Sequence, residues 1–293
     1  MDIDPEVWRD HRSYLMAVAY RLLGTGSEAE DAVQEAYLRL RRQEGTDIVE
    51  VRRWLTTVVA RICLDQLRSA RVRRERYLGI WLPEPLVGAD SQPGPGERFE
   101  LRESVQTAML IVLESLAPAE RVAFVLHDVF EVSFEDVGEV LERSASACRQ
   151  LSSRARLRLR RRVPRFEVTS AERERVVAAF MTATTEGNLR DLVKVLDPAV
   201  VFRSDGGGVV PAARAEVHGA ADVARLVHGL IERYSGATVA VLPVNGGPGI
   251  VMEQNGVVLA AAAIAVTHGR VAAIDVVVNP EKLRHVQLAA GHR

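Results

Sequence analysis

Arginines dominate the segment from Ala145 to Arg162, which contains no acidic residue. Guanidinium groups bind phosphates and base edges, and Ser and Gln side chains add hydrogen bonds to both. We expect the DNA contacts to come from the polar side chains in its first half: Ser146, Arg149, Gln150, Ser153, Arg154 and Arg156. For an arginine run standing by itself, the alternative is a solvated helix face whose cations favour the negative end of the helix dipole.

The residues just before this segment predict a short helix that would brace it. Ser133 and Asp136 form a capping-box-like start, and Val137, Val140 and Leu141 follow at helical spacing. Ser144 then caps the arginine-rich helix, which we expect to run through Arg162. Two short helices joined in this way predict a helix-turn-helix whose second helix lies in the major groove. With this brace in place, DNA binding is favoured over a solvated face.

A second basic series lies at the end of an earlier predicted helix, which starts near Val49 with Trp54, Leu55, Val58 and Ile62 on its inner face. A basic helix end is common, and pairing with Asp65 or Glu75 explains it equally well. If the series binds DNA, the residues concerned are Arg61, Arg68, Arg71, Arg73 and Arg74.

The preceding predicted helix presents Asp31, Gln34, Glu35 and Leu38 on a face displaced from its apolar stripe. We expect this helix to begin at a capping box formed by Ser27 and Glu30. A leucine among carboxylates indicates a partner surface, although a single exposed leucine is ordinary on any protein.

Composition and breaks rich in proline and glycine divide the 293 residues into several domains. Helical periodicity covers 1–80. A segment rich in proline and glycine, 81–99, then predicts a semi-rigid linker whose extended length of roughly 50 Å would let two modules reach separate elements. Helices resume from Leu101 over 100–165. Over 166–293, two helices precede Val/Ile/Ala-rich runs separated by turns such as Asn255-Gly256, which predicts a curved antiparallel sheet with helices on one side.

These motifs, in this order, resemble the extracytoplasmic-function sigma factors, the bacterial subunits that direct RNA polymerase to promoters. The resemblance covers Met1 to about Arg165. It implies that Asp31, Gln34, Glu35 and Leu38 dock on the clamp helices of the polymerase. It also implies that the helix from Trp54 to Arg68 contacts the upstream edge of the melted promoter, and that the helix-turn-helix reads the more distant promoter element.

Two further segments resemble the subgroup of these factors that carries a fused domain similar to polyketide cyclases of the ketosteroid-isomerase-like fold. They are Tyr77-Leu-Gly-Ile-Trp81-Leu82-Pro83 with Glu84-Pro85, and Asn279-Pro280-Glu-Lys282-Leu283. A third segment, Asp205-Gly206-Gly207-Gly208, continues with lysine in that subgroup, whereas Val209 follows here. The resemblance implies an α+β cone-shaped barrel that tunes sigma activity in cis. We expect these segments to pack together and against the first domain.

Catalysis by the C-terminal domain is the main alternative function for it. Isomerases on this fold use a carboxylate base in an apolar pocket. Asp275 is the most interesting candidate because burial in its apolar strand would raise its pKa, but hydrogen bonding within the sheet or exposure to solvent is the favoured interpretation. The glycine run after Asp205 lacks the context of a phosphate-binding loop. The remaining carboxylate and histidine candidates are Asp205, Glu216, His218 and Glu253.

Together these patterns predict a multidomain protein with two all-α sigma domains, the second holding the helix-turn-helix, followed by the α+β domain. We expect core RNA polymerase and promoter DNA as partners, a monomer when free, and no enzymatic activity. Neither Cys63 nor Cys148 argues for a disulfide or a zinc site, so we expect no metal or cofactor. No apolar stretch suits a bilayer span, and we expect the cytosol. The sequence leaves open whether the C-terminal pocket binds a small lipophilic ligand. It also leaves open two alternative functions: a DNA-binding regulator that recruits no polymerase, and an enzyme with an N-terminal DNA-binding region.

Overall fold

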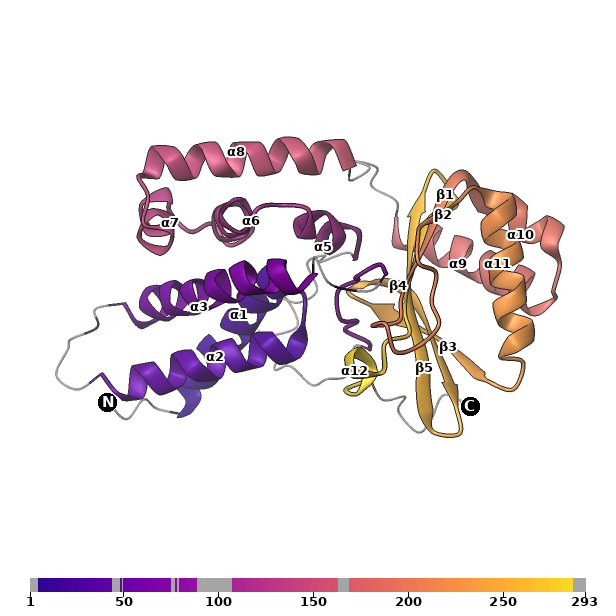
Figure 1. The fold of residues 1–293 in the computed structure, drawn as a ribbon, viewed down its shortest axis with the longest axis horizontal. Coiled ribbons are helices and arrows are strands. Elements are labelled where there is room, and N and C mark those ends of the chain that lie inside the picture. The colour runs from indigo at the N-terminus through magenta and orange to yellow at the C-terminus, as the bar shows by residue number, and fades with distance from the viewer. Residues whose placement is uncertain are drawn as a thin grey trace. The chain divides into compact units, whose positions relative to one another are not determined.

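The computed structural model of the chain describes residues 5–43, 48, 50–74, 77, 79–88, 107–162 and 169–286. The chain divides into two compact units (Figure 1). The first contains Met1–Glu75, Asp90–Val105 and Met109–Val163, and the second contains Arg76–Ala89, Gln106–Ala108 and Pro164–Arg293. The segment 76–89 therefore groups with the C-terminal sheet, whereas the sequence predicts that most of it is a spacer. The expected helical start at Leu101 lies outside the described residues.

Three helices form the N-terminal part of the first unit: α1 (Pro5–Leu23), α2 (Gly26–Arg41) and α3 (Val51–Arg74). Their core is the apolar stripe expected of α1 and α2, with Leu15, Leu22, Ala32 and Leu40 fully buried. Burial of each of these leucines contributes about 1.5–3 kcal/mol and helps to hold the three helices together.

Two sequence expectations for these helices are wrong in detail. The capping box at Ser27 does not form, because the N-cap of α2 is Thr25, two residues earlier. The Thr25 hydroxyl donates to Glu28 over 2.7 Å. The inner stripe of α3 is also rotated from the predicted one. Leu55 is buried as expected, and the stripe then continues through Val59, Cys63 and Leu67.

The second part of the first unit holds α5 (Thr107–Glu114), α6 (Pro118–Phe124), a π-helical turn η1 (Val125–Val129), α7 (Phe134–Leu141) and α8 (Ala145–Arg162). The Ser133 hydroxyl caps α7 by accepting from the amide of Asp136 over 3.1 Å, as predicted. Ser144 likewise accepts from the amide of Ala147 over 3.3 Å at the start of α8. These caps define the helix-turn-helix expected from the sequence.

The tight turn between α7 and α8 depends on a glycine. A Cβ atom at Gly138 would lie 2.6 Å from the backbone oxygen of Arg143, which has no freedom to move aside. Glu142 in the same turn adopts a left-handed conformation with φ of 54°. The close approach of backbone at this position is the reason for glycine within an otherwise apolar helix.

The second unit is an α+β domain. Its elements are α9 (Ser170–Thr185), α10 (Leu189–Val195), β1 (Leu196–Asp205), β2 (Val217–His218), α11 (Ala220–Arg233), β3 (Thr238–Val244), β4 (Gly247–Gln254), β5 (Val257–Thr267), β6 (Arg270–Val277) and α12 (Pro280–Leu283). Among the described residues the strands form one six-stranded sheet in the order β2-β1-β6-β5-β4-β3. Helices α9, α10 and α11 lie on one face of it (Figure 1).

Turn chemistry explains most of this topology. At Asn245-Gly246, Asn255-Gly256 and His268-Gly269 both turn residues have positive φ, the geometry of type I′ hairpin turns. Strands β3 to β6 are consequently antiparallel, as predicted. The expectation of an antiparallel sheet is wrong for the pairing of β1 with β6, which is parallel. Between these strands the chain passes through β2, α11 and strands β3 to β5. No local turn signal marks a pairing between strands this far apart in sequence.

Alternation along β1 gives its two faces different roles. Val200 and Phe202 are buried in the apolar core against the helices, with Phe180 and Ile274. Arg203 and Asp205 point to the opposite face, since neighbouring side chains in a strand alternate. That second face receives the segment from Tyr77 to Gly88.

Candidate nucleic-acid interface

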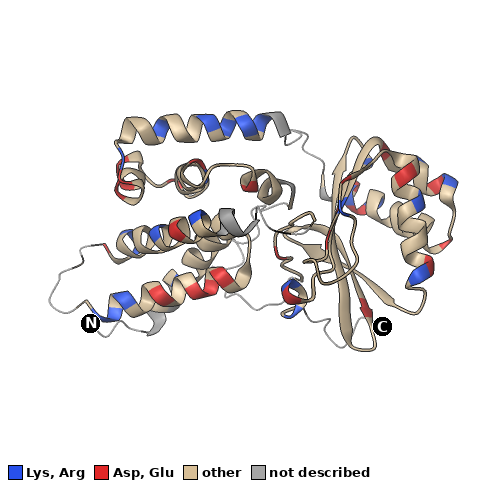
Figure 2. Cartoon of the chain, in the orientation of Figure 1, with Lys and Arg blue, Asp and Glu red and all other residues tan. Residues whose placement is uncertain are grey.

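The outer face of α8 is open to solvent. Ser146, Arg149, Gln150, Ser153 and Arg154 are all exposed, which brings together five of the six residues predicted there to contact DNA. Basic positions recur along the ribbon of this helix (Figure 2). The spacing places several donors on one surface, suited to phosphates and base edges.

The inner side of α8 is tied to the rest of the helix-turn-helix by ionic contacts. Arg156, the sixth predicted DNA contact, lies with its Nε 3.2 Å from Asp128 of η1, and Ser152 donates a hydrogen bond to the same carboxylate. Arg158 pairs with the nearly buried Glu120 of α6 over 2.6 Å. Arg156 therefore orients α8, and it is only half available to a phosphate.

The face of α2 predicted to bind a partner is accessible. Asp31 and Gln34 are exposed, Glu35 is partly exposed and pairs with Arg39 over 2.8 Å, and Leu38 exposes 39% of its surface. Several acidic positions recur along the ribbon of α2 (Figure 2). An apolar side chain ringed by acidic ones suits a partner that offers arginine or lysine around an apolar spot.

The described arginines of α3 make contacts within the protein, one of which is the pairing with Asp65 that the sequence left open. Arg61 donates to the backbone oxygen of Glu139 in α7 over 2.6 Å, and Arg68 pairs with Asp65 over 3.2 Å while staying exposed. Arg71, Arg73 and Arg74 continue the helix, and their side chains lie outside the described residues. Arg53, which the sequence did not single out, contacts both Asp136 and Glu139 of α7 at 2.5 and 2.9 Å.

Asp205 is the centre of a buried polar cluster in the second unit. Its carboxylate is fully buried and accepts from Tyr77 Oη at 2.5 Å, the amide of Leu82 at 2.8 Å and the amide of Gly207 at 2.9 Å. Lys282 Nζ lies 2.8 Å away. Burial and the bond to Asp205 raise the pKa of Tyr77, which therefore stays a phenol and a donor. We call Tyr77, Leu82, Asp205, Asn279 and Lys282 the clasp.

Lys282 completes the clasp from the short helix α12. Besides Asp205, it donates to the backbone oxygen of Leu82 and lies 4.0 Å from the centre of the Trp81 ring, a cation–π contact. Asn279 donates to Tyr77 over 3.3 Å. It is also the N-cap of α12, and Pro280 follows it in the first turn of that helix. Three predicted regulatory segments thus meet, with Leu82, Pro83 and Leu283 buried between them.

Glycines allow the backbone to reach the clasp. Gly207 has φ of 67°, and a Cβ atom there would lie 2.5 Å from Asn279. A Cβ atom at Gly206 would lie 2.2 Å from the backbone oxygen of Val210. Close approach therefore explains Gly206 and Gly207, while Gly208 supplies a second positive φ of 72°. Val209, which replaces the lysine expected from the subgroup, is 72% exposed.

A second set of contacts fastens the other end of the same segment. Asn245 and Leu86 exchange hydrogen bonds of 2.8 Å, and Val87 pairs with Val244 at the end of β3. His285 Nδ1 lies 2.9 Å from Glu84, and its Nε2 lies 2.9 Å from the oxygen of Pro85. Sequence reasoning missed Asn245 and His285, because neither carries a signal beyond a turn residue and an isolated histidine.

Asp275 is buried, as its apolar strand suggested, and is paired. Arg203 Nη1 lies 2.7 Å from it, and the same arginine contacts Glu216 over 3.0 Å, with His218 3.2 Å from Glu216. Burial raises the pKa of Asp275 to about 6, and Arg203 opposes that shift. Asp275 is therefore bonded to a neighbouring strand of the sheet, which agrees with the interpretation that the sequence favoured. Glu253 lies on β4 away from this chain of charges, facing Thr238.

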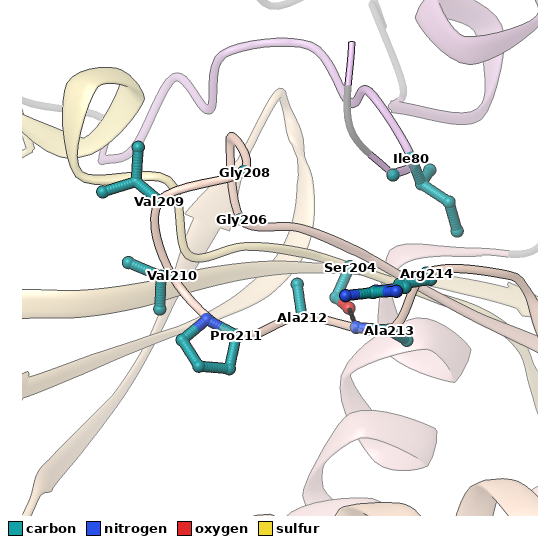
Figure 3. A pocket seen from close by; sticks show the side chains of 11 residues that line it. Ile80, Ser204, Gly206, Gly208, Val209, Val210, Pro211, Ala212, Ala213 and Arg214 are labelled. Atoms are coloured by element: carbon teal, nitrogen blue, oxygen red, sulfur yellow. Dashed lines mark hydrogen bonds between the residues drawn. The ribbon is translucent and has the colours of Figure 1, made fainter.

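A cavity of about 540 Å³ lies between Ile80 and the loop that follows β1 (Figure 3). Val209, Val210 and Pro211 supply much of its apolar lining. Ser204 and Arg214 lie close together at its polar end in Figure 3, where Ser204 accepts from the amide of Ala213 over 2.8 Å. This volume is in the range of small-molecule sites.

Comparisons with known proteins agree with this arrangement. The sigma-70 region 2 family matches residues 7–73, and the sigma-70 region 4 family matches residues 108–159. The ECF RNA polymerase sigma factor SigJ of Mycobacterium tuberculosis is 42% identical over 284 residues, which cover 92% of this chain and 90% of SigJ. The probable ECF sigma factor SigI of the same species is 36% identical, covering 97% and 96%.

A solved structure extends this similarity to three dimensions. The crystal structure of M. tuberculosis SigJ superimposes with a TM-score of 0.78 at 39% identity, covering 96% of this chain and 98% of that one. The match spans the helical domains and the C-terminal sheet domain alike. No helix in the described part of the chain combines the length and apolar content that a bilayer span needs.

Proposed function

Since the chain belongs to the extracytoplasmic-function sigma factors, which direct RNA polymerase to specific promoters for transcription initiation, we propose roles for its surfaces in that reaction. The exposed face of α8 reads the distal promoter element. The arginines of α3 contact the upstream edge of the melted region, and α2 docks on the clamp helices of the polymerase. The chain acts as a monomer in the cytoplasm, where it meets the polymerase.

The single observation that carries the polymerase contact is Leu38 exposed beside Asp31 and Glu35 on α2. Reversing both charges, Asp31→Arg with Glu35→Arg, should abolish co-purification with core polymerase because basic clamp residues would then be repelled. The matched control is Asp222→Arg with Glu232→Arg, an equal charge change on exposed α11 residues. Equal retention of polymerase by both variants would contradict the proposal.

Promoter reading by α8 is supported by its open row of donors. Arg149→Ala should lower affinity for the distal element roughly tenfold, in line with the 1–3 kcal/mol of a good base contact, and relax specificity there. Arg160→Ala, at an exposed position outside the predicted contacts, is the control. Run-off transcription by purified core polymerase on a promoter pool measures both properties.

The C-terminal domain regulates the sigma domains in cis through the segment 77–88. This proposal rests on the clasp, because that segment leads directly toward the helix-turn-helix domain along the chain. Deleting residues after Arg165 should change promoter-directed transcription, since the segment would lose the partners that hold it. Unchanged transcription by the truncated chain would contradict regulation in cis while leaving the sigma function intact.

The domain acts as a regulator without turnover. The carboxylates predicted as candidate bases are engaged: Asp205 by Lys282, and Asp275 by Arg203. A cation paired with a carboxylate favours its ionised form and lowers its basicity, which disfavours proton abstraction by either group. Failure to turn over a panel of cyclic ketones and epoxides, with and without Asp275→Asn, is the expected result.

The cavity beside Ile80, rather than the filled core of the sheet, is our proposed site for a small lipophilic ligand. Its apolar lining and Arg214 suit an apolar molecule with one anionic group. Anilinonaphthalene sulfonate, which has this character, should bind the full chain and lose affinity in Ala212→Trp, which fills the cavity. Equal binding by both proteins would contradict the site.

A further inference from the structure

Two acidic residues of the helix-turn-helix lie against arginines of the N-terminal domain within the first unit. Arg53 of α3 is shared between Asp136 and Glu139 of α7, and Arg61 donates to the backbone of Glu139. Helices α3 and α7 pack against each other at this point. Arg61 is also one of the arginines assigned above to promoter DNA.

A guanidinium that is bonded to a carboxylate or a carbonyl cannot offer the same donors to a phosphate. A carboxylate resembles a phosphate in charge and in its planar acceptor pair, which is why arginine binds both in a fork. Asp136 and Glu139 therefore present to α3 the chemistry that a DNA backbone would present. We propose that α7 occupies Arg61, one of the arginines of α3 assigned to DNA, together with its neighbour Arg53 in the free protein, and must leave both before α3 binds the promoter.

The remaining contacts between the two helical parts of the first unit are compatible with their separation. Tyr14 of α1 stacks edge-on against Phe130 with ring centres 5.3 Å apart, and Arg52 lies 3.9 Å from the Tyr14 ring. Next to these rings, a cavity of about 620 Å³ is lined by residues of both parts, including Thr56, Leu126 and Val140. Because this pocket is open to solvent, part of the surface of both helical parts beside the contact stays unburied and adds nothing to its stability.

The exposure of the ion pairs between α3 and α7 also indicates that this contact can open. The side chains of Arg53 and Glu139 are 49% and 55% exposed, so water and salt screen their attraction. The open face of α8 is unaffected, because its donors are exposed in the same structure. The free protein thus has the α8 surface available, while Arg61 of the α3 surface is held by its own α7.

This inference rests on the proposed role of α3 in DNA binding, and the test separates the two. Glu135 of α7 is exposed and makes no ion pair among the described residues, so Glu135→Arg matches Glu139→Arg in helix, charge change and size. Spin labels at Arg41→Cys on α2 and Arg160→Cys on α8 report the separation of the two parts, and both positions are exposed. The native cysteines are buried.

In the full chain without polymerase, we expect a single short label separation in the parent protein and in Glu135→Arg. Glu139→Arg should shift a large fraction to longer separations, and so should Arg53→Glu. In unlabelled protein, Glu139→Arg should bind a mixed-sequence single strand of about 20 nucleotides about threefold more tightly than Glu135→Arg does, measured by anisotropy at low salt.

The outcomes are distinct. Unchanged separations in both Glu139→Arg and Arg53→Glu overturn the inference, whatever the DNA affinity. Longer separations in Glu139→Arg with DNA affinity equal to that of Glu135→Arg keep α7 as a latch but refute the assignment of α3 to DNA. Longer separations with tighter DNA binding support both.

Discussion

Two ionic clusters join distant parts of the sequence, and they differ in their exposure to water. In the clasp, the side chain of Asp205 is fully buried and that of Lys282 is 10% exposed. Between α3 and α7, Arg53 and Glu139 are about half exposed. The first cluster holds the segment 77–88 on the C-terminal sheet, and the second holds two helices within the first unit. Only the second has partners that solvent can readily replace.

Burial decides what each cluster can do. Breaking a buried pair leaves an uncompensated charge and costs about 3–5 kcal/mol, whereas an exposed pair contributes about 0–1 kcal/mol. The clasp is therefore suited to making the segment 77–88 a fixed part of the C-terminal domain. The α3–α7 contact is suited to opening during a functional cycle, when DNA phosphates compete for the same arginines.

The largest expected effect follows from removing the lysine of the clasp. Lys282→Met should destabilise the second unit by about 3–5 kcal/mol, because Asp205 would stay buried without its cation. Urea unfolding followed by tryptophan fluorescence in a background with Trp8→Phe and Trp54→Phe, which leaves Trp81 as the reporter, measures the loss. Adding Asp205→Asn to Lys282→Met should recover part of it, since the neutral amide removes the unpaired charge. A loss under about 1 kcal/mol in the single variant would show that the pair is not buried as described.

A glycine substitution sharpens the role of close packing in the clasp. Gly207→Ala should cost about 2–3 kcal/mol, combining the strain of a positive φ with a Cβ contact to Asn279. Gly246→Ala is the matched control, because Gly246 has φ of 69° and open space around it. We expect about 1 kcal/mol there. Equal thermal destabilisation of the two variants would mean that backbone strain alone accounts for the loss of stability and that the Asn279 side chain moves away from the added Cβ atom.

The exposed cluster should respond weakly to mutation and strongly to salt. Arg53→Gln should lower the stability of the first unit by at most about 1 kcal/mol. The difference between parent and variant should vanish as NaCl rises from about 0.1 M to about 0.5 M, because screening removes the attraction first. Thermal unfolding at both salt concentrations measures this. A variant difference that persists at high salt would indicate a packing role for Arg53.

Local rules predicted the elements that bear function, and long-range contacts escaped them. The caps at Ser133 and Ser144 and the turn at Asn255-Gly256 are set by neighbouring residues, so the sequence alone sufficed. The parallel pairing of β1 with β6 depends on a contact between residues far apart in sequence, for which no local pattern exists. The contact of Arg61 with α7 is of the same kind.

The clasp lies between these cases. Resemblance to the subgroup predicted that the segments around Trp81, Asp205 and Lys282 meet, and the structure brings them together. The semi-rigid linker predicted over 81–99 begins with 81–88, which groups with the C-terminal sheet domain. Proline-rich composition is compatible both with a linker and with an extended segment bound along a sheet. Composition describes backbone stiffness, and it does not show which surface the segment contacts.

The smallest expected effect concerns pH and the far end of the segment 77–88. Both ring nitrogens of His285 face acceptors, the carboxylate of Glu84 and the oxygen of Pro85. A neutral imidazole has one N–H and satisfies only one of them, so the pKa of His285 is raised, chiefly by the bond to Glu84. A raised pKa in the folded state means that this contact stabilises fully below the ordinary value of 6.5 and weakens as pH rises through the higher folded value.

Amide hydrogen exchange at Leu86, whose N–H donates to Asn245, reports whether this end of the segment stays bound. After correction for intrinsic exchange, protection of Leu86 should fall modestly between pH 6 and pH 9 in the parent protein. His285→Gln should show less of this pH dependence, because its amide does not titrate in that range. His228→Gln, at a partly exposed histidine on α11, should behave like the parent. The same pH dependence in all three proteins would mean that His285 does not control this end, leaving Asn245 and the Val87–Val244 pairing to hold it without help from a titrating group.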